Sequence, residues 1–132
     1  MFDLLSYRLI AYLSVAIGAC FGAYCRLKIS SYISFNLNKK YFGTFVVNMI
    51  ACFFLGLIIA LNKNCEKFCS QNFEYLFICL GFLGTLSTFS TFVLEIFENL
   101  LAKRIKQAGI LLLGSIFGGL LFTFFGFVLG EL

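Results

Sequence analysis

The sequence contains no histidine, no proline and no tryptophan, and only 12% of its 132 residues are charged. Because histidine is absent, Ser-His and Cys-His catalysis are excluded, and most metal sites lose their commonest ligand. Soluble domains are about half apolar and about a quarter charged, whereas this chain is 61% hydrophobic. The composition therefore predicts a membrane protein without His-dependent catalysis, with residues 1–132 forming a single domain.

Four apolar stretches contain no Lys, Arg, Asp or Glu, and charged residues separate them. They cover residues 9–25, 41–61, 75–94 and 108–130. About 20 apolar residues cross a hydrocarbon core of roughly 30 Å, so the last three are long enough. The first needs Arg8 or Arg26 to reach the headgroups at its end. Barrel strands alternate, so the unbroken runs exclude a β-barrel. We predict an all-α membrane protein with four transmembrane helices and both termini on one side.

Three short connections are expected between these helices, at residues 26–40, 62–74 and 95–107. We therefore place the function inside the membrane and expect a small homo-oligomer in contact with membrane lipid.

The basic residues flank the membrane and indicate no nucleic-acid partner. The chain ends and the second connection carry three of them: Arg8, Lys63 and Lys67. The first and third connections carry seven: Arg26, Lys28, Lys39, Lys40, Lys103, Arg104 and Lys106. The positive-inside rule then points the termini outward.

Two polar or charged residues associated with the first two spans allow two interpretations each. Asn48 lies five residues after Gly43 in the second span. On its own it favours a hydrogen bond between helices, and a polar path is the alternative. Arg26 ends the first span and is either an anchor at the headgroups or an inward charge that attracts an anion.

The third span is richer in hydroxyl groups than a packing helix needs. Within seven positions it holds five such residues: Thr85, Ser87, Thr88, Ser90 and Thr91. Gly81 and Gly84 precede all five, weaken the helix and free backbone carbonyls. The sequence therefore predicts a break in the third helix near Gly84 and Ser87.

The residues after this break are expected to form a polar face edged by aromatic rings. At about 100° per residue, Thr88, Thr91 and Glu95 share one helix face. Phe89 and Phe92 lie beside that face. Such a surface is unsuited to lipid and predicts the protein interior or a narrow polar route.

Glycines and cysteines in the other segments favour packing roles. Gly18 and Gly22, and likewise Gly114 and Gly118, are spaced four apart, which is typical of closely packed membrane helices. Four of the six cysteines lie in the predicted spans, where cysteine packs as a small apolar residue. Cys65 and Cys69 are separated by three residues, unlike the two of a redox or zinc pair.

Three segments, in the correct order, resemble the Fluc/CrcB family of small fluoride channels, and the resemblance spans nearly the whole chain. Residues 18–26 are similar to the family pattern Gly-Gly-x-x-Gly-Ala-x-x-Arg, with Ala19 in place of a glycine. Residues 43–48 match Gly-Thr-x-x-x-Asn. Residues 81–95 match a glycine-rich start followed by Thr-Thr-Phe-Ser-Thr-Phe and a Glu, with Ser87 where Thr is usual. Val93 replaces a frequent hydroxyl residue, and the fourth span lacks the Tyr often found in its first half.

The resemblance implies a passive fluoride channel in the inner membrane of a prokaryote, built as an antiparallel, dual-topology dimer with two pores. The residues implied to line each pore are Asn48, Phe89, Ser90, Thr91 and Phe92. Arg26 and Glu95 would lie near the pore mouths. The backbone carbonyls of Gly84 and Ser87 would hold a structural Na⁺ shared with the same residues of the partner.

Two alternative functions remain open, and the distribution of basic residues conflicts with dual topology. A small four-helix proton-coupled multidrug exporter needs a carboxylate inside the membrane, and Glu95 is expected at a boundary. A thiol enzyme would depend on Cys65 and Cys69. Dual topology favours equal basic counts on both sides, whereas the counts are seven and three. Either Arg26 is buried and does not count, or the chain inserts one way and forms a heterodimer with an oppositely oriented paralogue.

Overall fold

The computed structural model describes residues 2–37, 41–63 and 73–132, nearly all of them helical. The elements are α1 (Phe2–Leu37), α2 (Phe42–Lys63), α3 (Phe73–Tyr75), the π-helix η1 (Leu76–Leu83), α4 (Gly84–Leu86), α5 (Phe89–Leu101) and α6 (Ile105–Glu131). Within these residues, four stretches are long and apolar enough to cross a membrane: Leu5–Asn36, Phe42–Leu61, Phe73–Leu101 and Ile105–Glu131. The predicted four-helix membrane fold is confirmed.

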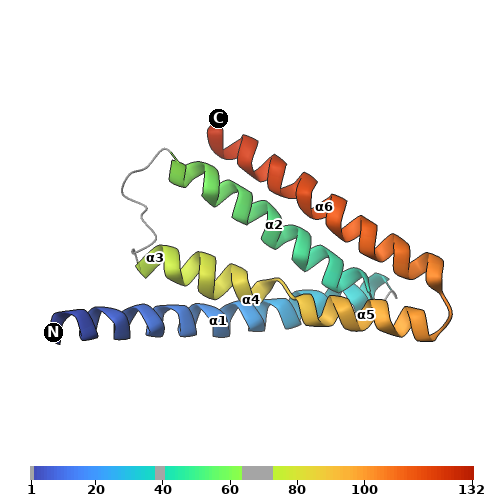
Figure 1. Ribbon diagram of the computed structural model, residues 1–132, viewed down its shortest axis with the longest axis horizontal. Coiled ribbons are helices and arrows are strands. Elements are labelled where there is room, and N and C mark those ends of the chain that lie inside the picture. Colours follow the sequence, from blue (N-terminus) through green and yellow to red (C-terminus); the bar gives the residue numbers. More distant parts are fainter. Residues whose placement is uncertain (1, 38–40, 64–72) are drawn as a thin grey trace.

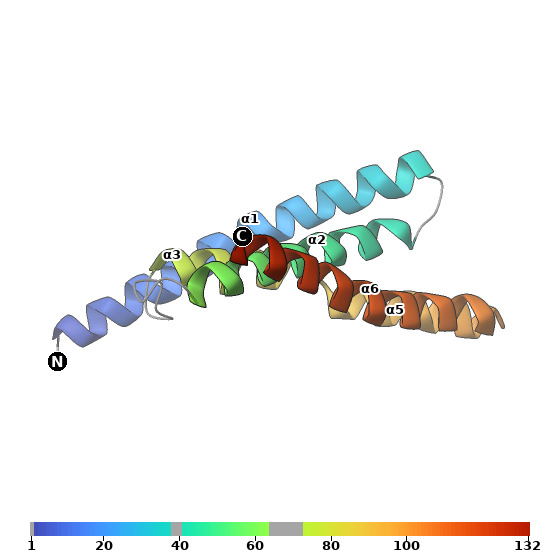
Figure 2. The ribbon, with the colours of Figure 1, turned by 90° about the horizontal axis from the view of Figure 1, so that it is seen from above.

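The four stretches alternate in direction along the chain (Figure 1). The largest contact joins α2 to α6, and the next joins α1 to η1. A small core of Ala51, Leu83 and Leu86 links α2 to the third stretch. Viewed from above, the C-terminal part of α1 diverges from α5 and α6, which run side by side (Figure 2).

The first helix is much longer than predicted. The predicted connection at 26–40 is wrong over residues 26–37, because α1 continues without a break to Leu37. Charge at Arg26 and Lys28 indicated an end, yet the segment contains no glycine or proline to stop a helix. Lys28 Nζ lies 5.7 Å from the centroid of the Tyr24 ring, one turn away. Arg26 is half-buried inside the helix. Lys39 and Lys40 lie outside the described residues.

The predicted break in the third stretch is confirmed and lies between α4 and α5. Gly84 is still helical, with φ −62° and ψ −29°. Ser87 and Thr88 are extended, with φ/ψ of −72°/153° and −143°/121°. The helix restarts at Phe89, where Thr88 is the N-cap and its hydroxyl accepts from the Thr91 N–H at 3.4 Å.

The connection predicted at 95–107 is wrong over its first half, because α5 runs on to Leu101. A tight turn closes the helix: the Lys103 N–H donates to the Leu100 carbonyl and the Arg104 N–H to the Asn99 carbonyl. This is the Schellman pattern, and Lys103 takes the left-handed position with φ 56°. Glu95 therefore lies within a helix and not at its end.

Glycine allows helices to cross closely, at some of the positions that the sequence predicts and not at others. Gly18 and Gly22 face the η1 backbone as their spacing predicts. The Gly114–Gly118 pair does not bring helices together: a Cβ at Gly114 would meet nothing within 4 Å. The Met49 and Phe45 side chains fill the space opposite Gly118. Backbones instead approach where α6 crosses α2 at Gly126, whose Cβ would fall on the Phe53 carbonyl oxygen.

The structure describes four of the six cysteines. Cys20, Cys25, Cys52 and Cys79 are free thiols on the helices. Cys65 and Cys69 lie outside the described residues, as does Lys67. Among residues 2–37, 41–63 and 73–132, no three His, Cys, Asp or Glu side chains gather into a group that could hold a metal ion.

Candidate functional site

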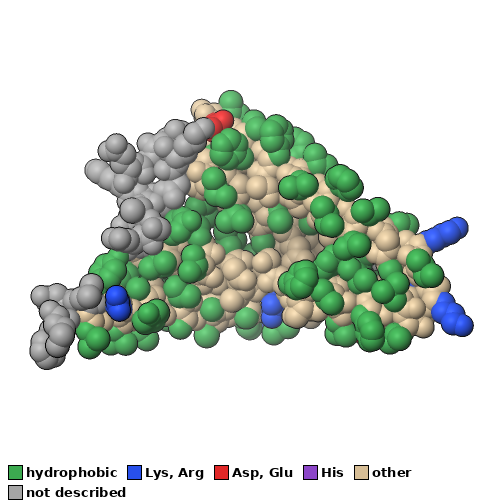
Figure 3. All heavy atoms as spheres, in the orientation of Figure 1, with side chains coloured by type: hydrophobic (Ala, Val, Ile, Leu, Met, Phe, Trp, Pro, Cys, Tyr) green, Lys and Arg blue, Asp and Glu red, His purple; other side chains and the backbone are tan. Residues whose placement is uncertain are grey.

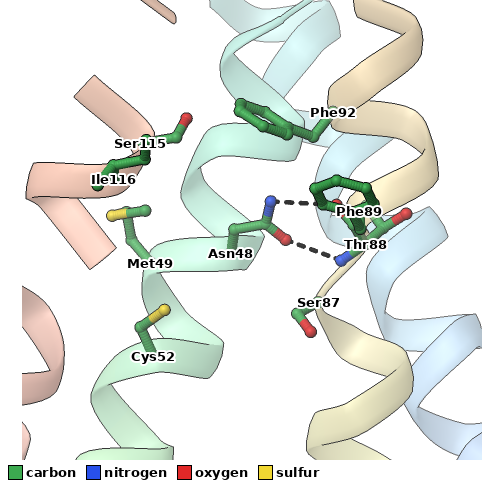
Figure 4. Close-up of a pocket in the computed structure, with 9 residues that line it drawn as sticks. All are labelled: Asn48, Met49, Cys52, Ser87, Thr88, Phe89, Phe92, Ser115 and Ile116. Carbon is green, nitrogen blue, oxygen red and sulfur yellow. Dashed lines mark hydrogen bonds between the residues drawn. The ribbon is translucent and has the colours of Figure 1, made fainter. Parts of the chain in front are cut away.

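The helix break is held open by one side chain from the neighbouring helix. Asn48 of α2 binds both backbone groups of Thr88 (Figure 4). The Thr88 N–H donates to Asn48 Oδ1 at 2.9 Å, and Asn48 Nδ2 donates to the Thr88 carbonyl at 3.3 Å. Asn48 therefore forms the hydrogen bond between helices that was the first of its two interpretations. Its side chain also lines a pocket.

This pairing redirects backbone donors and leaves carbonyls uncommitted. In a continuous helix the Thr88 N–H would bind the Gly84 carbonyl, and the Thr91 N–H would bind the Ser87 carbonyl. Here they bind Asn48 Oδ1 and Thr88 Oγ1 instead. The carbonyls of Gly84 and Ser87 thus lose the i+4 donors that a helix supplies. These are the two residues that the sequence singled out as carbonyl ligands.

Hydroxyl groups cluster on the C-terminal side of the break. Thr88 Oγ1 lies 3.1 Å from Thr91 Oγ1 and 3.4 Å from Ser90 Oγ. The predicted shared face of Thr88 and Thr91 is therefore real. Thr85 is separate: its hydroxyl donates to the Ala19 carbonyl of α1 at 3.0 Å and binds its own helix. Of the five hydroxyl residues, Thr85 thus serves packing.

The two predicted phenylalanines form a pair of rings at the same break. Their centroids are 6.2 Å apart and the ring planes meet at 46°. Phe89 is 77% exposed in the isolated chain, whereas Phe92 is half-buried. Both line a pocket of about 330 Å³ together with Asn48, Met49, Cys52, Ser87, Thr88, Ser115 and Ile116 (Figure 4). Ser115 and Ile116 come from α6 and Met49 and Cys52 from α2, and no sequence pattern predicted these four.

Glu95 lies two turns further along α5 and faces the protein interior. It is only 5% exposed, and Thr44 of α2 donates its hydroxyl to Glu95 Oε1 at 2.5 Å. The charge of Glu95 had indicated a span boundary, which is wrong because Thr44 supplies a buried partner. Thr44 itself is 2% exposed. Its position 51 residues earlier in the chain made this pair invisible to spacing arguments.

Asn99 contacts this site, whereas Arg26 does not line its pocket. Asn99 is 1% exposed, and its Nδ2 donates to the Glu95 backbone carbonyl at 2.8 Å. It was missed because residues 95–107 were predicted to be a connection. Arg26 lies on α1, next to Cys25, which packs against the Ala51, Leu83 and Leu86 core.

A family model described as CrcB-like protein, Camphor Resistance (CrcB), matches residues 13–127. The chain belongs to the CrcB family. The match runs from the first span to the last turns of α6 and includes the break, both phenylalanines and the Thr44–Glu95 pair.

Several CrcB relatives carry the name of a fluoride-specific ion channel. One from Prochlorococcus marinus is 45% identical over 107 residues, covering 81% of this chain and 82% of the relative. One from a Synechococcus species is 44% identical over 119 residues, covering 90% and 92%. A third, from Acinetobacter baylyi, is 37% identical over 116 residues, covering 86% and 88%.

Proposed function

We propose that this protein is a fluoride-selective channel that lets fluoride leave a prokaryotic cell passively through its plasma membrane. The observation that carries the proposal is the pocket at the helix break, where hydroxyl groups and a pair of phenyl rings meet. The names of its CrcB relatives support the same ion.

The pocket offers donors that can replace the water around fluoride. Fluoride is small and strongly hydrated, so a dry path must supply hydrogen bonds of its own. Asn48 uses one amide hydrogen on the Thr88 carbonyl, which leaves the second for an anion. The hydroxyls of Ser90 and Thr91 do not line the pocket but lie next to Thr88 Oγ1, which does, and they can also donate. These three side chains form the polar lining of the proposed pore.

Phe89 and Phe92 supply the other wall. An aromatic ring is positive at its edge, so a ring pair meets an anion without presenting a fixed charge. A full positive charge would bind the ion too tightly, since conduction depends on weak and repeated sites. We place Arg26 near a pore mouth, and Glu95, which is 5% exposed within a spanning stretch, further inside.

A structural Na⁺ fits the two uncommitted carbonyls. The backbone oxygens of Gly84 and Ser87 would hold it, together with the same atoms of a second copy. Such an ion would join the two copies at the break, and hard cations prefer oxygen ligands such as backbone carbonyls. What supports this proposal is the diversion of the Thr88 and Thr91 N–H groups away from these carbonyls.

We infer that the working unit is an antiparallel, dual-topology homodimer, which completes the walls that one chain leaves open. Phe89 supports this, because a pore-lining ring that is 77% exposed needs a facing surface. A heterodimer with an oppositely oriented paralogue is the alternative outcome of the topology test below.

The proton-coupled exporter is the less favoured function. An exporter needs a carboxylate inside the membrane, and Glu95 meets that requirement because it is buried within a spanning stretch. The absence of such a carboxylate is therefore not an argument against this function. The channel is favoured because its CrcB relatives carry the name of a fluoride-specific channel.

The roles of the rings can be tested by changing one that lines the pocket and one that does not. Purified protein in liposomes is expected to pass fluoride and not chloride. Phe92→Ile should lower fluoride flux about tenfold or more, because an aliphatic side chain has no positive edge. Phe97→Ile is the matched control, since Phe97 lies on α5, is 54% exposed and lies outside the pocket. Equal flux from both variants would reject the ring mechanism.

A further inference from the structure

The polar face of α5 continues one turn beyond Glu95. Thr88, Thr91, Glu95 and Asn99 follow one another at spacings of three, four and four residues, which places them on one side. Three of the four are buried, with Thr88 8% exposed, Glu95 5% and Asn99 1%, while Thr91 is half-buried. The face therefore leads from the pocket toward the end of α5, mostly shielded from lipid.

The side chain of Asn99 is satisfied at only one of its two polar atoms. Nδ2 donates to the Glu95 carbonyl at 2.8 Å. Oδ1 is buried and has no hydrogen-bond partner among the residues that the structure describes. Reversing the amide does not help, because Oδ1 would then meet the Glu95 carbonyl, and both are acceptors. Asn99 Oδ1 is thus fixed in place and requires a donor.

The far end of this face lies next to a basic turn, whose Arg104 N–H donates to the Asn99 carbonyl. The α5–α6 turn carries three exposed cations: Lys103, Arg104 and Lys106. Figure 3 shows Lys and Arg side chains at the end of the molecule where α5 and α6 meet. Positive charge at a channel end concentrates anions there.

We propose that Asn99 Oδ1 binds a water molecule, and that this water is where fluoride regains hydration between the polar face and the basic turn. The proposal rests on the proposed fluoride channel. Fluoride itself does not bind Oδ1, because both are acceptors. Water donates one hydrogen to Oδ1 and the other to the ion, so a single molecule serves both.

The test compares side chains that keep or remove an acceptor at position 99. Asn99→Leu should lower fluoride flux about tenfold, because no water is then held for the ion. Asn99→Ser should conduct like the original protein: its hydroxyl donates to the Glu95 carbonyl, as serine does in helices, and still accepts from water. Leu100→Ala is the control, since Leu100 is 48% exposed on the neighbouring position.

Thermal stability, measured on the same proteins, separates this role from a structural one. If Oδ1 holds no water, Asn99→Leu removes an unsatisfied buried atom, so stability rises while flux stays unchanged. That result overturns the proposal. Should Asn99→Leu fail to fold, Asn99→Ala and Asn99→Ser differ by one hydroxyl, and equal flux from these two also overturns it. The original protein is measured first, because absence of fluoride flux there rejects the channel and not the water site.

Discussion

Asn48 determines the geometry of the break at the scale of single residues. It satisfies the N–H and the C=O of Thr88 at once, so Thr88 can remain extended inside a membrane span. Unsatisfied backbone groups are costly in hydrocarbon, which is why irregular backbone there needs such a partner. The same two hydrogen bonds also release the Gly84 and Ser87 carbonyls.

Asn48→Leu should therefore destabilise the protein by about 2 kcal/mol or more, because it strands two backbone groups. The measurement is thermal unfolding in detergent. Ser115→Ala is the matched control: Ser115 lines the same pocket, and its buried hydroxyl binds no group in the described part of the chain. An unchanged melting temperature for Asn48→Leu would show that the Asn48–Thr88 pair is not what holds the break.

Residue spacing predicted the aromatic pair but not the long-range polar pairs. Phe89 and Phe92 are three apart on a helix, so their proximity follows from local geometry. The Thr44–Glu95 pair joins two helices, and its hydrogen bond depends on how α2 packs against α5. A single sequence contains no local signal for such a contact.

At the scale of elements, apolar runs located the spans while charges misplaced their ends. Arg26 and Glu95 were each taken to end a helix, yet both lie inside one. Glu95 is accommodated by Thr44, and the long side chain of Arg26 is only half-buried. The break was predictable because glycines and hydroxyl residues weaken a helix locally, whatever the helix packs against.

Helix packing gives a paired prediction on α6. Gly126→Ala should destabilise the protein, because its Cβ would fall on the Phe53 carbonyl oxygen where α6 crosses α2. Gly114→Ala should be neutral or raise stability by up to about 1 kcal/mol, since nothing lies within 4 Å of its Cβ and alanine favours the helix. Thermal unfolding of both variants decides this, and the opposite order would show that the α2–α6 contact is misassigned.

At the scale of the whole molecule, the position of Arg26 bears on the charge count that set orientation. Arg26 is half-buried inside α1 and not fully buried, so it stays among the seven basic residues of the first and third connections, against three on the other side. The bias toward one orientation therefore remains, and dual insertion needs a direct test.

Labelling of cysteines placed at both termini, in a variant without the native cysteines, tests dual insertion. In intact cells an impermeant thiol reagent should label about half of the molecules, because opposite orientations expose opposite sides. The same reagent on opened membranes sets full labelling as the control. Complete labelling, or none, in intact cells would mean a single orientation and would favour a heterodimer with an oppositely oriented paralogue.

The central claim is that this chain alone forms a fluoride-selective path. Its most direct test is ion efflux from liposomes that contain only the purified protein, loaded with equal fluoride and chloride and read by ion-selective electrodes. We predict fluoride efflux far above that of protein-free liposomes, with chloride efflux at the protein-free level. Equal efflux of the two ions, or no efflux of either, would contradict the account.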